Sequence, residues 1–190
     1  MTKENGGKKI LVAYATWSGV TRGVAQEIAK TLQSQRNAVD VFPVKEVKDV
    51  SEYDAVLVGT SLHMFGPVGD FRSFLKRNQK NLQNMPTAFF VVCANMQEDT
   101  PKNREQTLEW LNKGLKGLED IRPVDTGLFA GAMLTDTPEY QKANFVRKQM
   151  INAMYSMVQK QYGKNDFRDW AKIRAWADEV LEKFYKYQIK

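Results

Sequence analysis

The sequence of 190 residues predicts one α/β domain built on a parallel sheet. Five short apolar runs alternate with segments of helical periodicity, which is the pattern of parallel strands joined by crossover helices. The runs are continuously apolar, as expected of strands that helices cover on both faces. Polar loops follow three of them. Because the carboxyl ends of parallel strands share one edge of a sheet, we expect these loops to converge into one site.

The first two strands are predicted on either side of one helix. The run I-L-V-A-Y-A at 10–15 forms the first strand, and residues 1–8 before it are a polar lead expected to be disordered. The apolar residues from Val24 to Leu32 recur at helical spacing and predict the first helix. The second strand, 38–44, ends near Pro43 and a charged stretch.

The remaining strands continue the alternation. The run A-V-L-V-G at 55–59 is the third strand, and the amphipathic segment around Phe71 to Leu75 is the next helix. The fourth strand is expected at 88–94, a helix at 107–118 and the fifth strand at 123–132. The last helix follows Trp170.

The loop after the first strand has the chemistry of an anion site. Its sequence T-W-S-G-V-T holds three hydroxyls and a glycine directly before a helix, whose N-terminus carries unpaired N–H groups. A phosphate there needs no lysine, since Thr16, Ser18 and Thr21 add hydroxyl donors and Gly19 allows close approach. The alternative is an ordinary helix capped by Thr16 or Ser18. The nucleotide motifs G-x-x-x-x-G-K-[ST] and G-x-G-x-x-G are absent from the sequence.

The T-W-S-G-V-T segment resembles the phosphate loop of flavodoxins, which binds the phosphate of FMN. The resemblance implies a flavodoxin-like, doubly wound five-stranded sheet of order 2-1-3-4-5 with FMN as cofactor. It also implies that the loops after the third and fourth strands frame the flavin ring. These loops lack the tryptophan–tyrosine pair of classical carriers, so we expect a more open flavin. The implied cofactor-binding residues are Thr16, Trp17, Ser18, Gly19, Val20, Thr21, Thr60, Ser61, Leu62, His63, Met64, Phe65, Gly66, Ala94, Asn95 and Met96.

Two single side chains in this region have two interpretations each. His63 is either a solvated or hydrogen-bonded loop histidine or a group beside the flavin that tunes it or moves a proton. Cys93 is interpreted as a buried strand residue in preference to a thiolate nucleophile. No catalytic acid or base is assigned.

Composition narrows the class of protein. One cysteine excludes an internal disulfide, and one histidine beside it makes a zinc centre improbable, so no metal is expected. No apolar run approaches the roughly 20 residues of a membrane span, and we expect a cytoplasmic protein. The net charge of +6 suits acidic partners or substrates. A nucleic-acid binder ranks last, because no recognition motif accompanies the charge.

About thirty-five residues separate the fifth strand from the last helix, and we interpret 136–167 as an inserted segment within one domain, 1–190. Residues 140–164 contain five Lys or Arg and no Asp or Glu. An apolar, methionine-rich stripe runs through them at helical spacing. Such a helix either packs on the sheet edge with its lysines in water, or contacts a partner, a hydrophobic ligand or an anionic membrane. The stripe consists of Phe145, Val146, Met150, Ile151, Met154, Met157 and Val158.

Further segments are similar to the flavodoxin-like, menaquinone-dependent protoporphyrinogen IX dehydrogenase family. They are G-T-S-L-H-M-F-G, N-M-P-T-A-F-F-V-V, G-L-F-A-G-A-M, the inserted basic helix and D-W-A-K-I-R-A-W-A. The resemblance implies an FMN-dependent oxidoreductase that oxidises protoporphyrinogen IX for haem synthesis and passes electrons to a quinone. It also implies peripheral contact with the inner face of the cell membrane through 140–164. The alternative is a flavodoxin-type electron carrier that docks to redox proteins through its basic surface.

Overall fold

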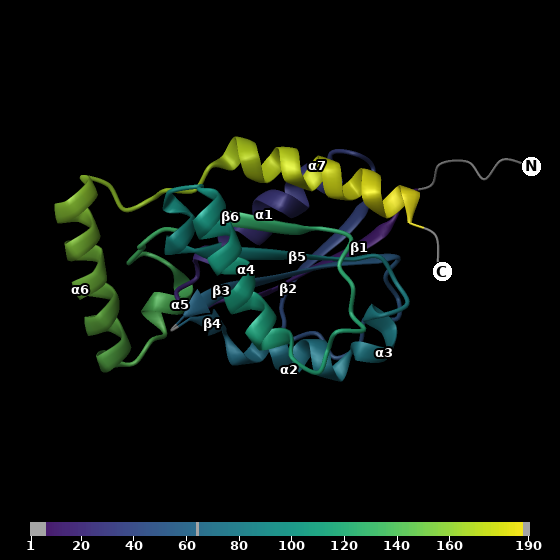
Figure 1. The fold of residues 1–190 in the computed structure, drawn as a ribbon, viewed down its shortest axis with the longest axis horizontal. Coiled ribbons are helices and arrows are strands. Elements are labelled where there is room, and N and C mark those ends of the chain that lie inside the picture. Colours follow the sequence, from purple (N-terminus) through teal and green to yellow (C-terminus); the bar gives the residue numbers. More distant parts are fainter. Residues whose placement is uncertain (1–6, 64, 188–190) are drawn as a thin grey trace, which may run out of the picture.

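A computed structural model describes residues 7–63 and 65–187 and places a parallel sheet at the centre of the domain (Figure 1). The sheet order β2-β1-β3-β5-β6 confirms the predicted order, since β5 and β6 are the fourth and fifth of the long strands. A short strand, β4, pairs antiparallel with β3. The strands are β1 (Lys9–Ala15), β2 (Ala38–Pro43), β3 (Ala55–His63), β4 (Gly66–Pro67), β5 (Thr87–Cys93) and β6 (Thr126–Ala130).

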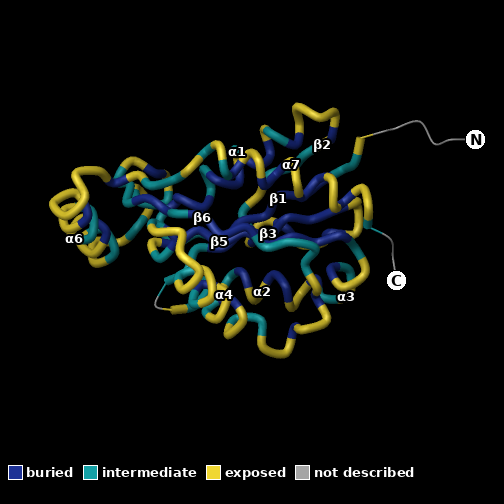
Figure 2. The backbone as a smooth tube through the Cα atoms, turned by 45° about the horizontal axis from the view of Figure 1, so that its top comes forward, coloured by how far each residue is buried: buried dark blue, intermediate teal, exposed yellow. Residues whose placement is uncertain are grey.

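Helices cover both faces of the sheet, which makes the domain doubly wound. The helices are α1 (Val20–Gln33), α2 (Gly69–Arg77), α3 (Gln79–Leu82), α4 (Pro101–Leu115), α5 (Pro138–Gln141), α6 (Phe145–Tyr162) and α7 (Trp170–Lys186), with a 3-10 helix η1 (Ala94–Gln97). Side chains of α1 and α7 pack on one face, and those of α2, α3 and α4 pack on the other (Figures 1 and 2).

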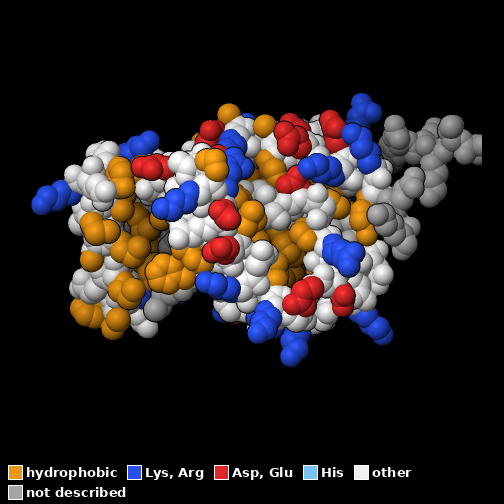
Figure 3. Space-filling view, viewed as in Figure 1, with side chains coloured by type: hydrophobic (Ala, Val, Ile, Leu, Met, Phe, Trp, Pro, Cys, Tyr) orange, Lys and Arg blue, Asp and Glu red, His pale blue; other side chains and the backbone are white. Residues whose placement is uncertain are grey.

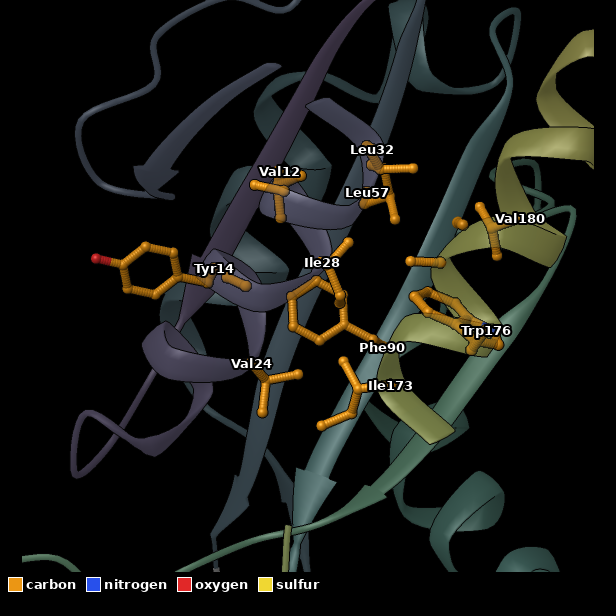
Figure 4. Close-up of a cluster of buried hydrophobic side chains, with 14 of the residues drawn as sticks. Val12, Tyr14, Val24, Ile28, Leu32, Leu57, Phe90, Ile173, Trp176 and Val180 are labelled. Carbon is orange, nitrogen blue, oxygen red and sulfur yellow. The ribbon is translucent and has the colours of Figure 1, made fainter. Parts of the chain in front are cut away.

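The strand β1 shows why a continuous apolar run predicts a strand of this sheet. Its residues Ile10, Val12 and Tyr14 point into the cluster beneath α1 and α7, and the residues between them point into the opposite cluster. Figure 4 shows the first cluster, where Phe90 and Trp176 lie close to Ile173 of α7. Both faces of β1 are therefore buried.

Gly59 on β3 leaves room for an aromatic side chain of the neighbouring strand. Its register partner on β5 is Phe90, which is fully buried. A Cβ built on Gly59 would lie 2.0 Å from Phe90 Cζ, inside any allowed contact distance. Glycine at this position is a packing requirement of the core.

Several predicted boundaries are corrected by the structure. The third strand ends at His63 instead of Gly59. Thr60 and Ser61 continue the parallel pairing with β5, and Leu62 and His63 pair with β4 in a hairpin. The fifth strand is shorter than 123–132, and α4 starts at Pro101, where Thr100 caps the helix by accepting from Asn103 N. Lys8 is held in place, since its N–H donates to Asn37 Oδ1 at 2.9 Å. The rest of the predicted disorder, 1–6, lies outside the described residues.

The insert, residues 136–167, is tied at its base to the carboxyl end of β6. Met133 N donates to Asn165 O at 2.8 Å, and Phe167 N donates to Gly131 O at 3.1 Å. From this base α6 runs across the carboxyl end of the sheet, at the left of the view in Figure 1. Within residues 7–63 and 65–187, no helix combines the length and apolar character that crossing a bilayer requires.

The predicted apolar stripe of α6 is divided between the protein and its surroundings. Along one edge of the stripe, Ile151 and Val158 are buried. Along the other edge, Val146 is 68% exposed and Met157 is 60% exposed. Hydrophobic side chains gather over α6 on the side that faces the viewer, at the left of Figure 3. The helix therefore has an inward apolar face and an outward one.

Candidate functional site

The loop between β1 and α1 forms a compact turn at the N-terminus of α1. Gly19 is the N-cap residue with φ of 91°, a conformation that favours glycine. The alternative interpretation, an ordinary helix with Thr16 or Ser18 as its N-cap, is therefore wrong. Thr16 Oγ1 instead accepts a hydrogen bond from Gly19 N at 2.9 Å, which closes the loop in front of the helix.

Thr21 presents a hydroxyl that has no hydrogen-bond partner. The residue is fully buried in the first turn of α1, and its Oγ1 is among the buried polar atoms without a partner. Burying a hydroxyl unpaired costs free energy, so such an atom marks a place where a ligand can supply the missing partner. This position beside the α1 N-terminus suits an anionic group.

Residues at the end of β3 contact the loop between β1 and α1. Trp17 N donates to Ser61 Oγ at 3.0 Å, so the loop and the strand have a fixed relative position. The rings of Trp17 and His63 stack with centroids 4.4 Å apart and planes 12° apart. Thr60 is fully buried, and its Oγ1 donates to Ser61 O. A flat aromatic wall thus stands beside the turn at the N-terminus of α1, the predicted anion-binding turn.

A cavity of about 110 Å³ lies between the loop, the β3 end and the strand ends beyond it. The predicted residues Trp17, Ser18, Val20, Thr21, Ser61, Leu62, His63 and Ala94 line it. The sequence interpretation missed its other lining residues, which are Val92, Cys93, Gln97, Gly131, Ala132, Met133 and Met154. The position of Gly131 to Met133 after a strand was the available signal for three of them. Nothing in the local sequence pointed to Met154, because it comes from α6.

Seven of the described predicted residues do not line this cavity. Thr16, Gly19 and Thr60 belong to the turn and the strand end described above, and the other four lie elsewhere. Phe65 is 70% exposed and contacts the Trp110 ring on α4, with centroids 5.3 Å apart, and Gly66 pairs with His63 in the hairpin. Asn95 donates to Asn103 O and Thr107 Oγ1, and Met96 is buried in the core cluster beneath α4. The predicted Met64 lies outside the described residues.

The insert contributes a cation to the same place. The Arg147 guanidinium of α6 lies over the Trp17 ring, 5.0 Å from its centroid, and its Nε is buried without an acceptor. Burial lowers the pKa of His63 below its ordinary value, and the nearby Arg147 charge lowers this pKa further. The imidazole is therefore neutral at pH 7. The stacking on Trp17 and the place in the cavity lining bring His63 to the candidate site, and a role beside the flavin stays a prediction.

The thiol of Cys93 is packed at the carboxyl end of β5. Burial raises the pKa of Cys93, which keeps the thiol protonated and agrees with its interpretation as a strand residue. In the described part of the chain, no group of three or more His, Cys, Asp or Glu side chains is arranged to hold a metal ion. The chemistry of the site is thus that of an anion turn beside an aromatic and apolar slot.

Comparison with known proteins assigns the fold to a family. The model of the family described as "Flavodoxin domain" matches residues 11–165, which include the turn, both ring loops and most of the insert. The chain belongs to the flavodoxin domain family. A solved structure, flavodoxin 2 from Bacillus cereus, has a TM-score of 0.54 at 17% identity and covers 93% of this chain and 99% of its own. That likeness concerns the fold alone.

Two curated relatives share the name protoporphyrinogen IX dehydrogenase [quinone]. The Escherichia coli K12 protein is 27% identical over 191 residues, covering 96% of this chain and 99% of its own length. The Leishmania major protein is 26% identical over 183 residues, covering 90% of this chain and 74% of its own length. The chain is similar to both.

Membership of the flavodoxin domain family implies a flavin cofactor, and the site residues fit one. The partnerless Thr21 hydroxyl and the α1 N-terminus suit a phosphate group, and the Trp17–His63 wall suits a flat ring. When bound, a flavin supplies the redox chemistry, and the protein binds, orients and tunes it.

Proposed function

We propose that this protein is an FMN-dependent oxidoreductase that oxidises protoporphyrinogen IX and uses a quinone as electron acceptor. The observation that carries the proposal is the full-length similarity to the Escherichia coli relative of that name. The match covers 96% of this chain. The unmatched residues are fewer than those of the insert, so the match includes the insert. The shared part is thus the flavodoxin core together with the segment that closes over its site.

The proposed roles of the residues follow from their positions. The turn from Thr16 to Thr21 holds the phosphate through backbone N–H groups and the Thr21 hydroxyl. Leu62 and Met154 give the ring slot apolar walls that exclude water, and Trp17 gives it a flat aromatic one. Neutral His63 stands at the slot without adding positive charge to it.

The cations beside the turn are compatible with a substrate that bears carboxylates. A second cavity of about 290 Å³, beside the turn, is lined by Lys45, Lys142 and Arg147 and also by Asp70 and Glu139, so cations exceed carboxylates by one. Protoporphyrinogen IX carries propionate groups, which such cations attract. The net charge of +6 also attracts acidic molecules to the protein as a whole.

A flavodoxin-type electron carrier is the second candidate. The observation that favours it is the outward face of α6, where Val146 and Met157 are exposed on a helix that also carries Lys148 and Lys160. A basic surface with adaptable methionine side chains suits docking to an acidic protein partner.

An anaerobic titration distinguishes the dehydrogenase from the electron carrier. The FMN-loaded protein is mixed with protoporphyrinogen IX, and the flavin absorbance is followed before and after a menaquinone analogue is added. Bleaching by the porphyrinogen that the quinone reverses supports the dehydrogenase. A flavin that stays oxidised with porphyrinogen, yet exchanges electrons with a redox protein in a salt-dependent way, supports the carrier. Protein that does not bind FMN contradicts both.

A further inference from the structure

A carboxylate of the insert lies against the anion-binding turn. A Cβ built on Gly19 would lie 2.5 Å from Glu139 Oε2 and 2.6 Å from the Thr137 Cβ, so these side chains fill the space over the glycine. Thr137 Oγ1 also donates to Ser18 O at 2.7 Å. The start of the insert is therefore closed onto the loop that the proposed phosphate would use.

The Glu139 carboxylate lacks a hydrogen-bond donor at this position. Its Oε2 is buried and has no hydrogen-bond partner, and the nearest cation, Arg22, has its Nη1 4.0 Å away. A buried carboxylate oxygen without a donor is costly, and the partial positive charge of the α1 N-terminus compensates for part of that cost. The carboxylate thus lies next to the N-terminus of α1 without accepting a hydrogen bond there. The Thr21 hydroxyl, also buried without a partner, belongs to the same turn.

The ring side of the site is closed by the same segment. The cavity there measures about 110 Å³, whereas cofactor sites typically measure roughly 300–1,000 Å³. Met154 of α6 lines this cavity, and Arg147 covers the outer face of Trp17. The insert therefore restricts both the phosphate end and the ring end of the site.

We propose that the insert is a lid and that Glu139 occupies the phosphate position in the flavin-free protein. The inference rests on the proposed binding of FMN. The phosphate of FMN and the Glu139 carboxylate are both anions that need the same N-terminus, so FMN binds only when Glu139 withdraws. Glu139 consequently weakens the affinity for FMN, and this effect depends on the phosphate group.

The test compares FMN with riboflavin, which has the same ring and no phosphate. The dissociation constants of both flavins are measured by fluorescence quenching for the wild type, Glu139→Gln and Glu179→Gln. The last variant removes a carboxylate from an exposed position of α7 and serves as the control for net charge. We expect Glu139→Gln to bind FMN about tenfold more tightly, with riboflavin unchanged, and Glu179→Gln to match the wild type.

The outcomes separate the lid from the proposed function. Equal FMN affinity in Glu139→Gln and wild type overturns the lid inference and leaves FMN binding intact. An equal gain for riboflavin also overturns it, because Glu139 would then act on the ring. If no variant binds FMN, the proposed function fails, and the lid inference fails with it.

Inorganic phosphate provides a second probe, because it needs no space for a ring. The amide resonances of Gly19 and Thr21 are followed during a phosphate titration of flavin-free protein. We expect the shifts to saturate at lower phosphate concentration in Glu139→Gln than in wild type. The same saturation curve in both proteins contradicts the inference independently of any flavin measurement.

Discussion

The Thr21 hydroxyl is expected to affect the stability of the fold and the affinity for the cofactor in opposite directions. Its Oγ1 is buried without a partner, so Thr21→Val removes an unsatisfied hydroxyl. We expect the free energy of unfolding to rise by about 1 kcal/mol in the flavin-free protein. FMN affinity is expected to fall about tenfold, because the phosphate loses a donor. Urea denaturation and flavin fluorescence measure the two effects.

The matched control is Thr87→Val at the opposite end of the sheet. Thr87 is also fully buried, but its Oγ1 donates to Leu82 O and Met85 O. That variant is expected to lose stability and keep its FMN affinity. If Thr21→Val behaves in the same way as this control, Thr21 is a packing residue and not a phosphate ligand.

His63 gives the protein a pH dependence of known sign. Its pKa in the folded protein lies below the ordinary value of 6.5, first because of burial and second because of Arg147. The unfolded chain therefore binds the proton more tightly. The contribution of His63 to stability is present above pH 6.5 and is lost as the pH falls from there through the lowered pKa.

We therefore expect the urea midpoint of the wild type to fall between pH 7.5 and pH 5, and to fall less in His63→Gln. Both proteins contain the same carboxylates, so the difference between their pH profiles isolates the imidazole. Identical profiles would mean that His63 titrates alike in the folded and unfolded states, and would contradict its burial against Trp17 and Arg147.

At the scale of elements, the strands were the most predictable part of the chain. Continuous apolar runs such as 10–15 and 88–94 identified strands buried on both faces, and their alternation with helices gave the class of fold. The β3 end was less predictable, because its last residues are strand only through pairing with β4. Tertiary pairing of this kind leaves no periodicity in the sequence to detect.

The candidate site was predictable where the backbone of one loop forms it. The turn from Thr16 to Thr21 lies where the motif indicated. Asn95 and Met96 were assigned to the ring by their place after a strand, but η1 turns Met96 into the core and Asn95 toward α4. The contributions of Glu139 and Arg147 depend on how a distant segment folds back, which local sequence does not encode.

The outward face of α6 is exposed, and substitutions of its apolar side chains can test what it contacts. Val146 and Met157 are exposed on a helix that also carries Lys148 and Lys160, and the membrane contact that the sequence resemblance implies would use these side chains. We expect Val146→Ser combined with Met157→Ser to weaken binding to vesicles that contain anionic lipid by about tenfold. The unfolding temperature should be unchanged, because both side chains already contact water.

Phe42→Ser is the control for that measurement, since Phe42 is 40% exposed on β2, outside the insert. It should sediment with vesicles to the same extent as the wild type. If the α6 double variant also binds like the wild type, the outward face does not contact the membrane, and docking to a protein partner becomes the better explanation of its exposure.

For the whole molecule, the division of the core predicts that the insert is separable from the domain. Among the described residues, the two buried clusters on the faces of the sheet draw on α1, α7, α2, α3 and α4, and include none from α5 or α6. The ends of the insert are already held together by the Met133–Asn165 and Gly131–Phe167 hydrogen bonds. A short linker can therefore bridge them without distorting β6.

We expect a variant with residues 136–164 replaced by a short Gly/Ser linker to unfold in one cooperative transition, monitored by circular dichroism. Removing Glu139 frees the phosphate end of the site, and removing Met154 takes one apolar wall from the ring slot. We expect the first effect to outweigh the second, so that the FMN affinity is at least that of the wild type. Turnover of protoporphyrinogen IX should fall, since the cations of the insert no longer line the entrance. A variant that does not fold would show that the inward face of α6 belongs to the core, and one that folds but loses FMN would show that the insert holds the cofactor instead of covering its site.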